Sequence, residues 1–197
     1  MLAQYYDRIY PNMFLYAAVA AILISVAVIV VGFAIHMIGL TLATLVGIFV
    51  DPWIVYAVIN YLFFPGVMIH ETAHALFALL TGAKVTEVAL FKKEGHSLGH
   101  VAFRNRGGVF LVALQNILIS AAPMFVGTAV LLGCRYVLLG YPDLALWVKI
   151  LVGYLGISMF FHMTMSPEDI KIYVRGLPLF SLLLFGVVLV FRALGYL

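Results

Sequence analysis

Long apolar runs with no polar face dominate the chain, and they predict helices that cross a lipid bilayer. A helix needs about 20 apolar residues to cross a hydrocarbon core roughly 30 Å thick. The first run predicts a helix over about residues 13–38, and the apolar stretch LTLATLVGIFV after it either extends this helix or forms a separate span. The run is far longer than the core of a signal peptide, so we expect a retained membrane anchor.

A second helix is predicted to begin at the sequence DPW, because Asp51 is a favourable N-cap and Pro52 suits the first helical position. It runs to Leu80 with a kink at residues 65–66, and Gly82 occupies the position typical of a helix C-cap. Three further spans are predicted over about residues 109–132, 144–163 and 179–194. The expected fold class is an all-α polytopic membrane protein with about five transmembrane helices, or six if the first run divides.

One extended polar region separates the second span from the third. Its first part, KVTEVALF, alternates and is rich in β-branched residues, KKEGHSLG is typical of a turn, and HVAF can return as a second strand. We therefore expect a membrane-associated β-hairpin directly after the second helix. A single membrane domain accounts for residues 1–197, and its functional core is expected over about residues 53–175.

The composition agrees with a membrane protein, because 65% of the residues are hydrophobic and 10% are charged, against roughly a quarter charged in soluble domains. The net charge is +3, but the basic residues are scattered and form no stripe, which argues against a nucleic-acid partner. Most of them lie in the hairpin region or just after the fourth span: Lys84, Lys92, Lys93, Arg104, Arg106, Lys171 and Arg175. The positive-inside rule predicts that these regions face the cytoplasm, which we expect to be that of a prokaryotic cell.

The second helix carries the segment VMIHETAHALF, which contains an HExxH pattern. Positions i and i+4 share a helix face, so His70 and His74 can bind one metal ion with Glu71 beside it. Ionisable groups at bilayer depth cost at least ~2–3 kcal/mol each, and a bound metal is the simplest interaction that offsets this cost. The pattern predicts one zinc ion per chain and Glu71 as the general base that takes a proton from the attacking water.

A third metal ligand is predicted in the segment FHMTMSPEDIK, at the end of the fourth span. If the helix continues through Pro167, then His162, Ser166 and Asp169 lie on one face. We predict Asp169 as the ligand, with Glu168 as the alternative. Ser166 and Pro167 also suit the start of a new helix, and that interpretation does not exclude metal binding.

Three polar side chains are candidates for supporting roles. His162 is predicted to hold a metal ligand or to stabilise an oxyanion, and Ser166 shares its helix face. Asn116 lies within the third span, where a buried amide must find a partner; it either orients the substrate or forms a hydrogen bond between helices. We interpret His96 and His100 as solvated hairpin residues.

These segments resemble the site-2 protease family of intramembrane zinc metalloproteases. IHETAHALFALLTGAKVTEVALF is similar to the metal-binding helix and hairpin of that family, and ISAAPMFVGTAVLL is similar to its next helix. The resemblance covers about residues 65–175 and implies cleavage of transmembrane or membrane-proximal substrates from a site that opens to the cytoplasm. The segment SPEDIK departs from the usual Asp-Gly pair of the family and resembles a short, divergent branch of membrane zincins.

Two alternatives stay open beside the protease. One is a membrane zincin in which Glu168 is the third ligand, and the other is a non-catalytic pseudoprotease or membrane chaperone that binds transmembrane segments. The intact Glu71 favours an enzyme, since a scaffold has no need of a base. The expected partners are the lipid bilayer, a membrane protein or peptide as substrate, and an accessory membrane protein.

Overall fold

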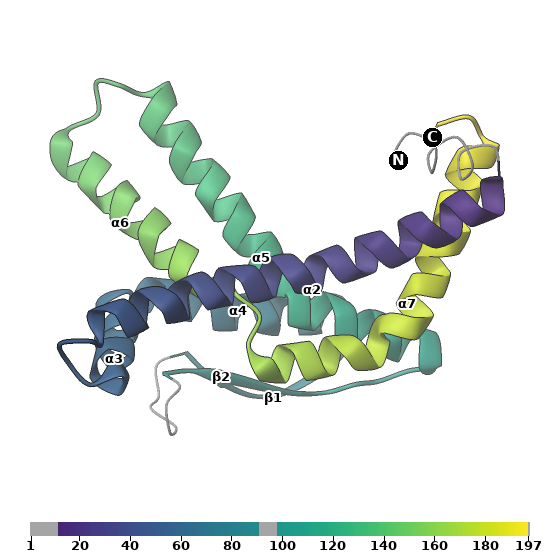
Figure 1. Cartoon of the computed structure of the whole chain (residues 1–197), viewed down its shortest axis with the longest axis horizontal. Helices are drawn as coiled ribbons and strands as arrows, with labels where there is room; N and C mark the ends of the chain where they lie inside the picture. The colour runs from purple at the N-terminus through teal and green to yellow at the C-terminus, as the bar shows by residue number, and fades with distance from the viewer. Residues whose placement is uncertain (1–11, 91–97, 197) are drawn as a thin grey trace.

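The first helix is continuous over nearly all of the first apolar run. The computed structural model describes residues 12–90 and 98–196, so the expectations for Lys92, Lys93 and His96 lie outside the described residues (Figure 1). Helix α2 runs over Met13–Val46, and it includes most of the stretch LTLATLVGIFV. This stretch therefore extends the first helix and does not form a separate span.

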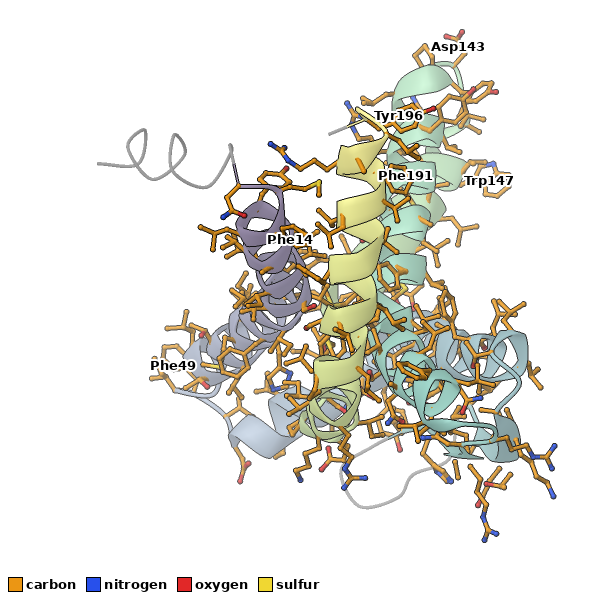
Figure 2. All side chains as sticks on the ribbon, turned by 90° about the vertical axis from the view of Figure 1, so that its right-hand side faces the viewer. Phe14, Phe49, Asp143, Trp147, Phe191 and Tyr196 are labelled. Atoms are coloured by element: carbon orange, nitrogen blue, oxygen red, sulfur yellow. The ribbon has the colours of Figure 1, made fainter. Side chains whose placement is uncertain are left out.

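Three helices in the described part of the chain are long and apolar enough to cross a membrane: α2, α5 (Val109–Gly140) and α7 (Pro167–Ala193). Two further apolar helices, α4 (Phe64–Leu80) and α6 (Leu146–His162), have 17 residues each and are shorter than a full span. Figure 2 shows large apolar side chains such as Phe49 and Trp147 on the outside of the molecule, where they are 87% and 69% exposed. These features agree with a helical membrane protein.

The predicted second span is divided into two helices next to the predicted kink at residues 65–66, and its predicted end at Leu80 is confirmed. Helix α3 covers Pro52–Leu62 and α4 starts at Phe64, because Pro65 has no N–H to continue the helix. The break exposes main-chain groups, which side chains of α6 bind. The Ser158 hydroxyl donates to the Phe63 carbonyl and accepts from the Gly66 N–H, each at 2.7 Å. The Tyr154 hydroxyl donates to the Leu62 carbonyl at 2.6 Å.

The predicted hairpin is present, with β1 over Lys84–Ala89 and β2 over His100–Arg104 in antiparallel pairing. Helix α4 ends before it as expected, because Gly82 has a φ of +78°, a conformation that glycine adopts without strain. The N–H groups of Gly82 and Ala83 then bond to the carbonyls of Leu79 and Ala78, which closes the helix end. The turn of the hairpin lies outside the described residues.

Helix α5 lies at the centre of the fold and packs against α4, α6 and α7. Buried side chains of α5, of α7 and of the link before it form one core: Ile117, Ala121, Met165 and Tyr173. Helix α2 lies across α7 (Figure 1), and the Tyr173 hydroxyl donates to the Ser25 carbonyl at 3.0 Å. This packing fixes the start of α7 beside α4.

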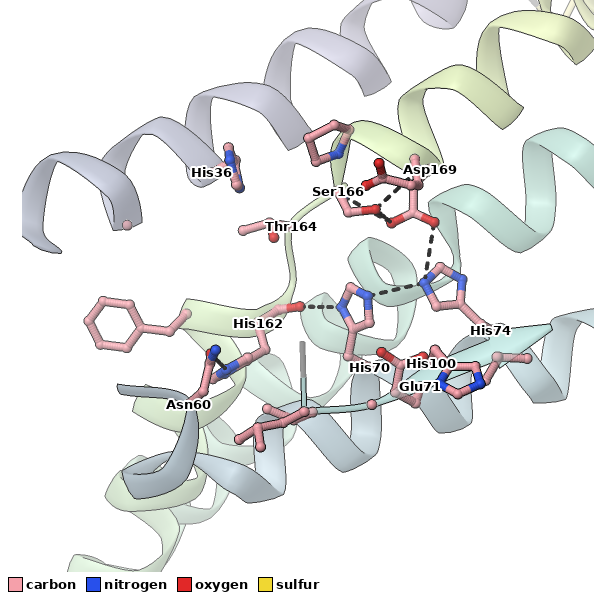
Figure 3. Close-up of a pocket in the computed structure, with 18 of the residues that line it drawn as sticks. His36, Asn60, His70, Glu71, His74, His100, His162, Thr164, Ser166 and Asp169 are labelled. Carbon is pink, nitrogen blue, oxygen red and sulfur yellow. Dashed lines mark hydrogen bonds and ion pairs between the residues drawn. The ribbon is translucent and has the colours of Figure 1, made fainter. Parts of the chain in front are cut away.

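Helices α6 and α7 are separate, so the condition of a continuous helix through Pro167, on which a shared face of His162, Ser166 and Asp169 depended, is not met. Helix α6 ends at His162, and α7 begins at Pro167 with Ser166 as its N-cap. Proline at the first helical position starts a helix without loss of a hydrogen bond, which favours this break. The link between the two helices passes close to α4 and carries the start of α7 to the HExxH segment (Figure 3).

Candidate metal centre

Helix α4 presents His70 and His74 from adjacent turns of one face, as their spacing requires. Their Nε2 atoms are 3.1 Å apart. The carboxylate of Asp169, from the first turn of α7, places Oδ1 3.5 Å from Nε2 of His74 (Figure 3). One ligand atom from each residue lies within 4.8 Å of the other two. His70 and Asp169 are 99 residues apart in the sequence, yet their side chains converge on one point.

Two of the three distances between these atoms fit a tetrahedral metal ion. Ligands at about 2.0–2.1 Å from zinc lie about 3.3 Å apart along each edge of the tetrahedron. The distances of 3.1 and 3.5 Å bracket that value. Two imidazoles and a carboxylate are also a donor set that zinc accepts, and they leave the fourth position for water or substrate.

Main-chain carbonyls orient both imidazole rings. Nδ1 of His70 donates to the His162 carbonyl at 2.6 Å, and Nδ1 of His74 donates to the Ile119 carbonyl at 2.7 Å. A carbonyl can only accept, so each ring carries a proton on Nδ1 and keeps the Nε2 lone pair for a metal. This arrangement of an outer acceptor behind each ligand is usual in metal sites.

The Asp169 carboxylate is fixed by a reciprocal cap at the start of α7. Its Oδ2 accepts from the Ser166 N–H at 2.9 Å and from the Ser166 hydroxyl at 2.7 Å. The Asp169 N–H donates back to the Ser166 hydroxyl at 3.1 Å. One carboxylate oxygen is therefore held by the cap, and the other is directed at His74. The helix-start interpretation of this segment is confirmed, and it is compatible with metal binding by Asp169.

Glu71 lies beside the two histidines, buried at 8% exposure, on the wall of a cavity of about 760 Å³. The hairpin covers it closely, because a Cβ atom added at Gly99 would lie 2.8 Å from Cγ of Glu71. The cavity is also lined by α2, α3 and the link between α6 and α7, through His36, Asn60 and Thr164 among others. Glu71 therefore lines the same cavity as His70, His74 and Asp169.

Of the predicted supporting residues, His162 contacts the cluster and Asn116 does not line the cavity. His162 contributes its carbonyl to His70, whereas its ring contacts the Ser158 carbonyl and the Asn60 amide at 2.8 and 3.2 Å. Asn116 accepts from Asn105 at 2.6 Å and is not among the described residues that line the cavity.

The side chains of Glu168 and His100 lie near the cluster but contact other residues. The carboxylate of Glu168 is 75% exposed and lies 3.7 Å from the amine of Lys171. The geometry therefore favours Asp169 over Glu168 as the third ligand. Nε2 of His100 lies 3.4 Å from the carboxylate of Glu87, across the hairpin, although His100 also lines the cavity.

The carbonyls of Ile119 and His162 are functional groups that the sequence could not identify by residue type, because every residue has a main-chain carbonyl.

A comparison with models of known protein families, with characterised proteins and with solved structures finds no match to the chain. The geometry of the cluster therefore carries any functional proposal.

Proposed function

We propose that this chain is a zinc-dependent intramembrane endopeptidase that hydrolyses peptide bonds of transmembrane or membrane-proximal substrates. One observation carries the proposal: His70, His74 and Asp169 direct ligand atoms at one point on a cavity that Glu71 also lines. The resemblance of the HExxH helix, hairpin and acidic segment to the site-2 protease family supports the same activity.

The residues of the site have two roles in the proposed reaction, metal binding and proton transfer. His70, His74 and Asp169 would hold the zinc ion, which would supply Lewis acidity to activate water near neutral pH and to polarise a carbonyl. Glu71 accepts the proton of the attacking water and transfers it to the amine that leaves when the peptide bond breaks. Burial keeps Glu71 away from bulk solvent, so its proton stays with the reacting groups.

The substrate must enter the cavity in extended form. Carbonyls of a helical substrate are already hydrogen-bonded, and unwound main chain inside a membrane needs new partners. The hairpin lines the cavity with residues from Leu98 to Phe103, next to Glu71. A free edge of this two-stranded sheet can pair with an extended peptide and present it to the metal ligands.

The cationic side chains support an orientation with the site toward the cytoplasm. Lys84, Arg104 and Arg106 lie at the base of the hairpin, and Lys171 and Arg175 lie in the first half of α7, all of them exposed. Arg192, at the far end of α7, lies over the ring of Tyr16 at the start of α2. The site end thus carries more positive charge, which the positive-inside rule assigns to the cytoplasmic face.

The test uses the purified chain in lipid nanodiscs with zinc and a mixture of single-span membrane peptides, and mass spectrometry of the products. We expect new peptide termini with the wild type and a loss of about 10²–10⁴-fold in rate with Glu71→Gln, at unchanged zinc content. Glu168→Gln is the matched control and should cleave normally. Peptides that bind the wild type but stay intact would instead favour the non-catalytic chaperone.

A further inference from the structure

We infer that Pro123 is a positioning residue, which reserves the Ile119 carbonyl for His74 because it removes the main-chain N–H that would otherwise bond to it. The inference rests on the proposed metal centre and concerns how the chain keeps one of its ligands in the binding orientation. Pro123 stands inside α5 and is fully buried, like Ile119.

The helix geometry identifies the two residues as a pair. In an α-helix the carbonyl of residue i accepts from the N–H of residue i+4, so the Ile119 carbonyl belongs to position 123. Proline has no N–H, and its ring also presses against that carbonyl. The Ile119 oxygen is therefore left without its helical donor in the interior of the fold, where an unpaired polar group is costly.

His74 supplies the missing donor. Its Nδ1 lies 2.7 Å from the Ile119 oxygen, and His74 is 7% exposed, so water does not compete strongly. The hydrogen bond fixes the proton on Nδ1 and the lone pair on Nε2, which is the atom that lies 3.1 Å from Nε2 of His70. A proline in one helix thus sets the tautomer of a ligand on another.

His70 is likewise held by a main-chain carbonyl that has no helical donor. Its acceptor is the carbonyl of His162, the last residue of α6, and a helix end leaves that carbonyl without a helical donor. The N–H four residues later belongs to Ser166, and it donates to the Asp169 carboxylate. Both imidazoles therefore use carbonyls that the main chain does not, which favours a role for Pro123 beyond bending α5.

The test compares two replacements at position 123 and a control. Pro123→Ala restores an N–H, whereas lactic acid incorporated at position 123 supplies an ester oxygen and no N–H, without the proline ring. Pro178→Ala removes the exposed proline inside α7, away from the cluster. Zinc affinity is measured by competition with a chelator in detergent, and the His74 tautomer is measured by ¹⁵N NMR of the metal-free protein.

We expect Pro123→Ala to weaken zinc binding about tenfold and to reduce the Nδ1-protonated form of His74. The lactic acid variant should stay within about twofold of the wild type, as should Pro178→Ala. The midpoint temperature of thermal unfolding should not be lower in Pro123→Ala than in the wild type, because α5 gains a hydrogen bond. If Pro123→Ala fails to fold, the zinc affinity of the lactic acid variant alone decides.

Unchanged zinc affinity in Pro123→Ala, or an affinity of the lactic acid variant as weak as that of Pro123→Ala, would overturn the inference and leave the metal centre standing. A wild-type protein that binds no zinc would overturn the proposed function as well. The two failures are therefore distinguishable.

Discussion

Ser166 holds one oxygen of the Asp169 carboxylate, with its hydroxyl 2.7 Å and its N–H 2.9 Å from Oδ2, so that Oδ1 is left for His74. A residue that starts a helix thereby also orients a metal ligand. The same hydroxyl accepts from the Asp169 N–H, so the cap and the ligand cannot be changed independently.

Ser166→Ala should therefore weaken zinc binding by about tenfold and also lower the free energy of unfolding by about 1 kcal/mol. Zinc titration and thermal unfolding of the purified protein measure the two effects. Ser181→Ala, which removes a hydroxyl of α7 that contacts Ser25, is the control for a general loss of packing. Equal zinc affinity in Ser166→Ala and the wild type would show that the cap does not orient the ligand.

Gly66→Ala should destabilise the protein by about 1–3 kcal/mol, because α4 and α6 meet at this residue. An added Cβ would overlap the Ser158 carbonyl oxygen and would lie 2.6 Å from Nδ1 of His162. Chemical unfolding in detergent measures the change. Gly153→Ala on α6, where nothing lies within 4 Å of the new Cβ, should be neutral or stabilising. A loss of equal size in both variants would contradict the close packing at Gly66.

Gly99→Ala should slow peptide cleavage by as much as about a hundredfold and leave zinc content unchanged. The new Cβ would lie 2.8 Å from Cγ of Glu71 and 2.9 Å from the Ala89 carbonyl oxygen, so the base or the strand has to move. Cleavage rate and zinc content are measured on one preparation, beside Gly133→Ala, whose Cβ meets nothing within 4 Å. Full activity in Gly99→Ala would contradict the proposal that the hairpin at Gly99 holds Glu71 in its working position.

Removal of the metal should lower the midpoint of thermal unfolding, because an ion that binds only the folded chain stabilises it by mass action. At a free zinc concentration about 100 times the dissociation constant, this contribution is about 2.7 kcal/mol. Unfolding of the wild type with and without a chelator measures it. The double variant His70→Ala, His74→Ala should show no difference between the two conditions, and a chelator effect that persisted there would place the metal elsewhere.

The HExxH pattern allowed the cluster to be predicted, because residues four apart on a helix must share a face and three ionisable groups need a reason to lie in an apolar segment. Asp169 was predicted as a ligand on either of two interpretations of its segment, a continuous helix or a new helix that starts at Pro167, and the structure contains the second. The residue reaches His74, since a helix that starts at Pro167 places its first acidic residues near the end of α6.

Other features could not be read from residue types. A kink was predicted near Pro65, but the contacts that complete the break between α3 and α4 come from Tyr154 and Ser158 of α6, which bind the carbonyls of Leu62 and Phe63 and appear in no local pattern. The acceptors behind His70 and His74 are main-chain carbonyls, and any residue type carries one. For the Ile119 carbonyl, Pro123 inside an apolar helix marks in the sequence that the helical donor is missing.

The zinc content of the purified protein tests the three-ligand centre most directly, with the wild type measured beside Asp169→Ala and Glu168→Ala. The geometry predicts about one zinc per chain in the wild type and in Glu168→Ala, and a strong loss in Asp169→Ala, because Asp169, unlike Glu168, directs a carboxylate oxygen at His74. Full zinc content in Asp169→Ala, or its loss in Glu168→Ala, would contradict the assigned third ligand, and a wild type without zinc would contradict the metal centre itself.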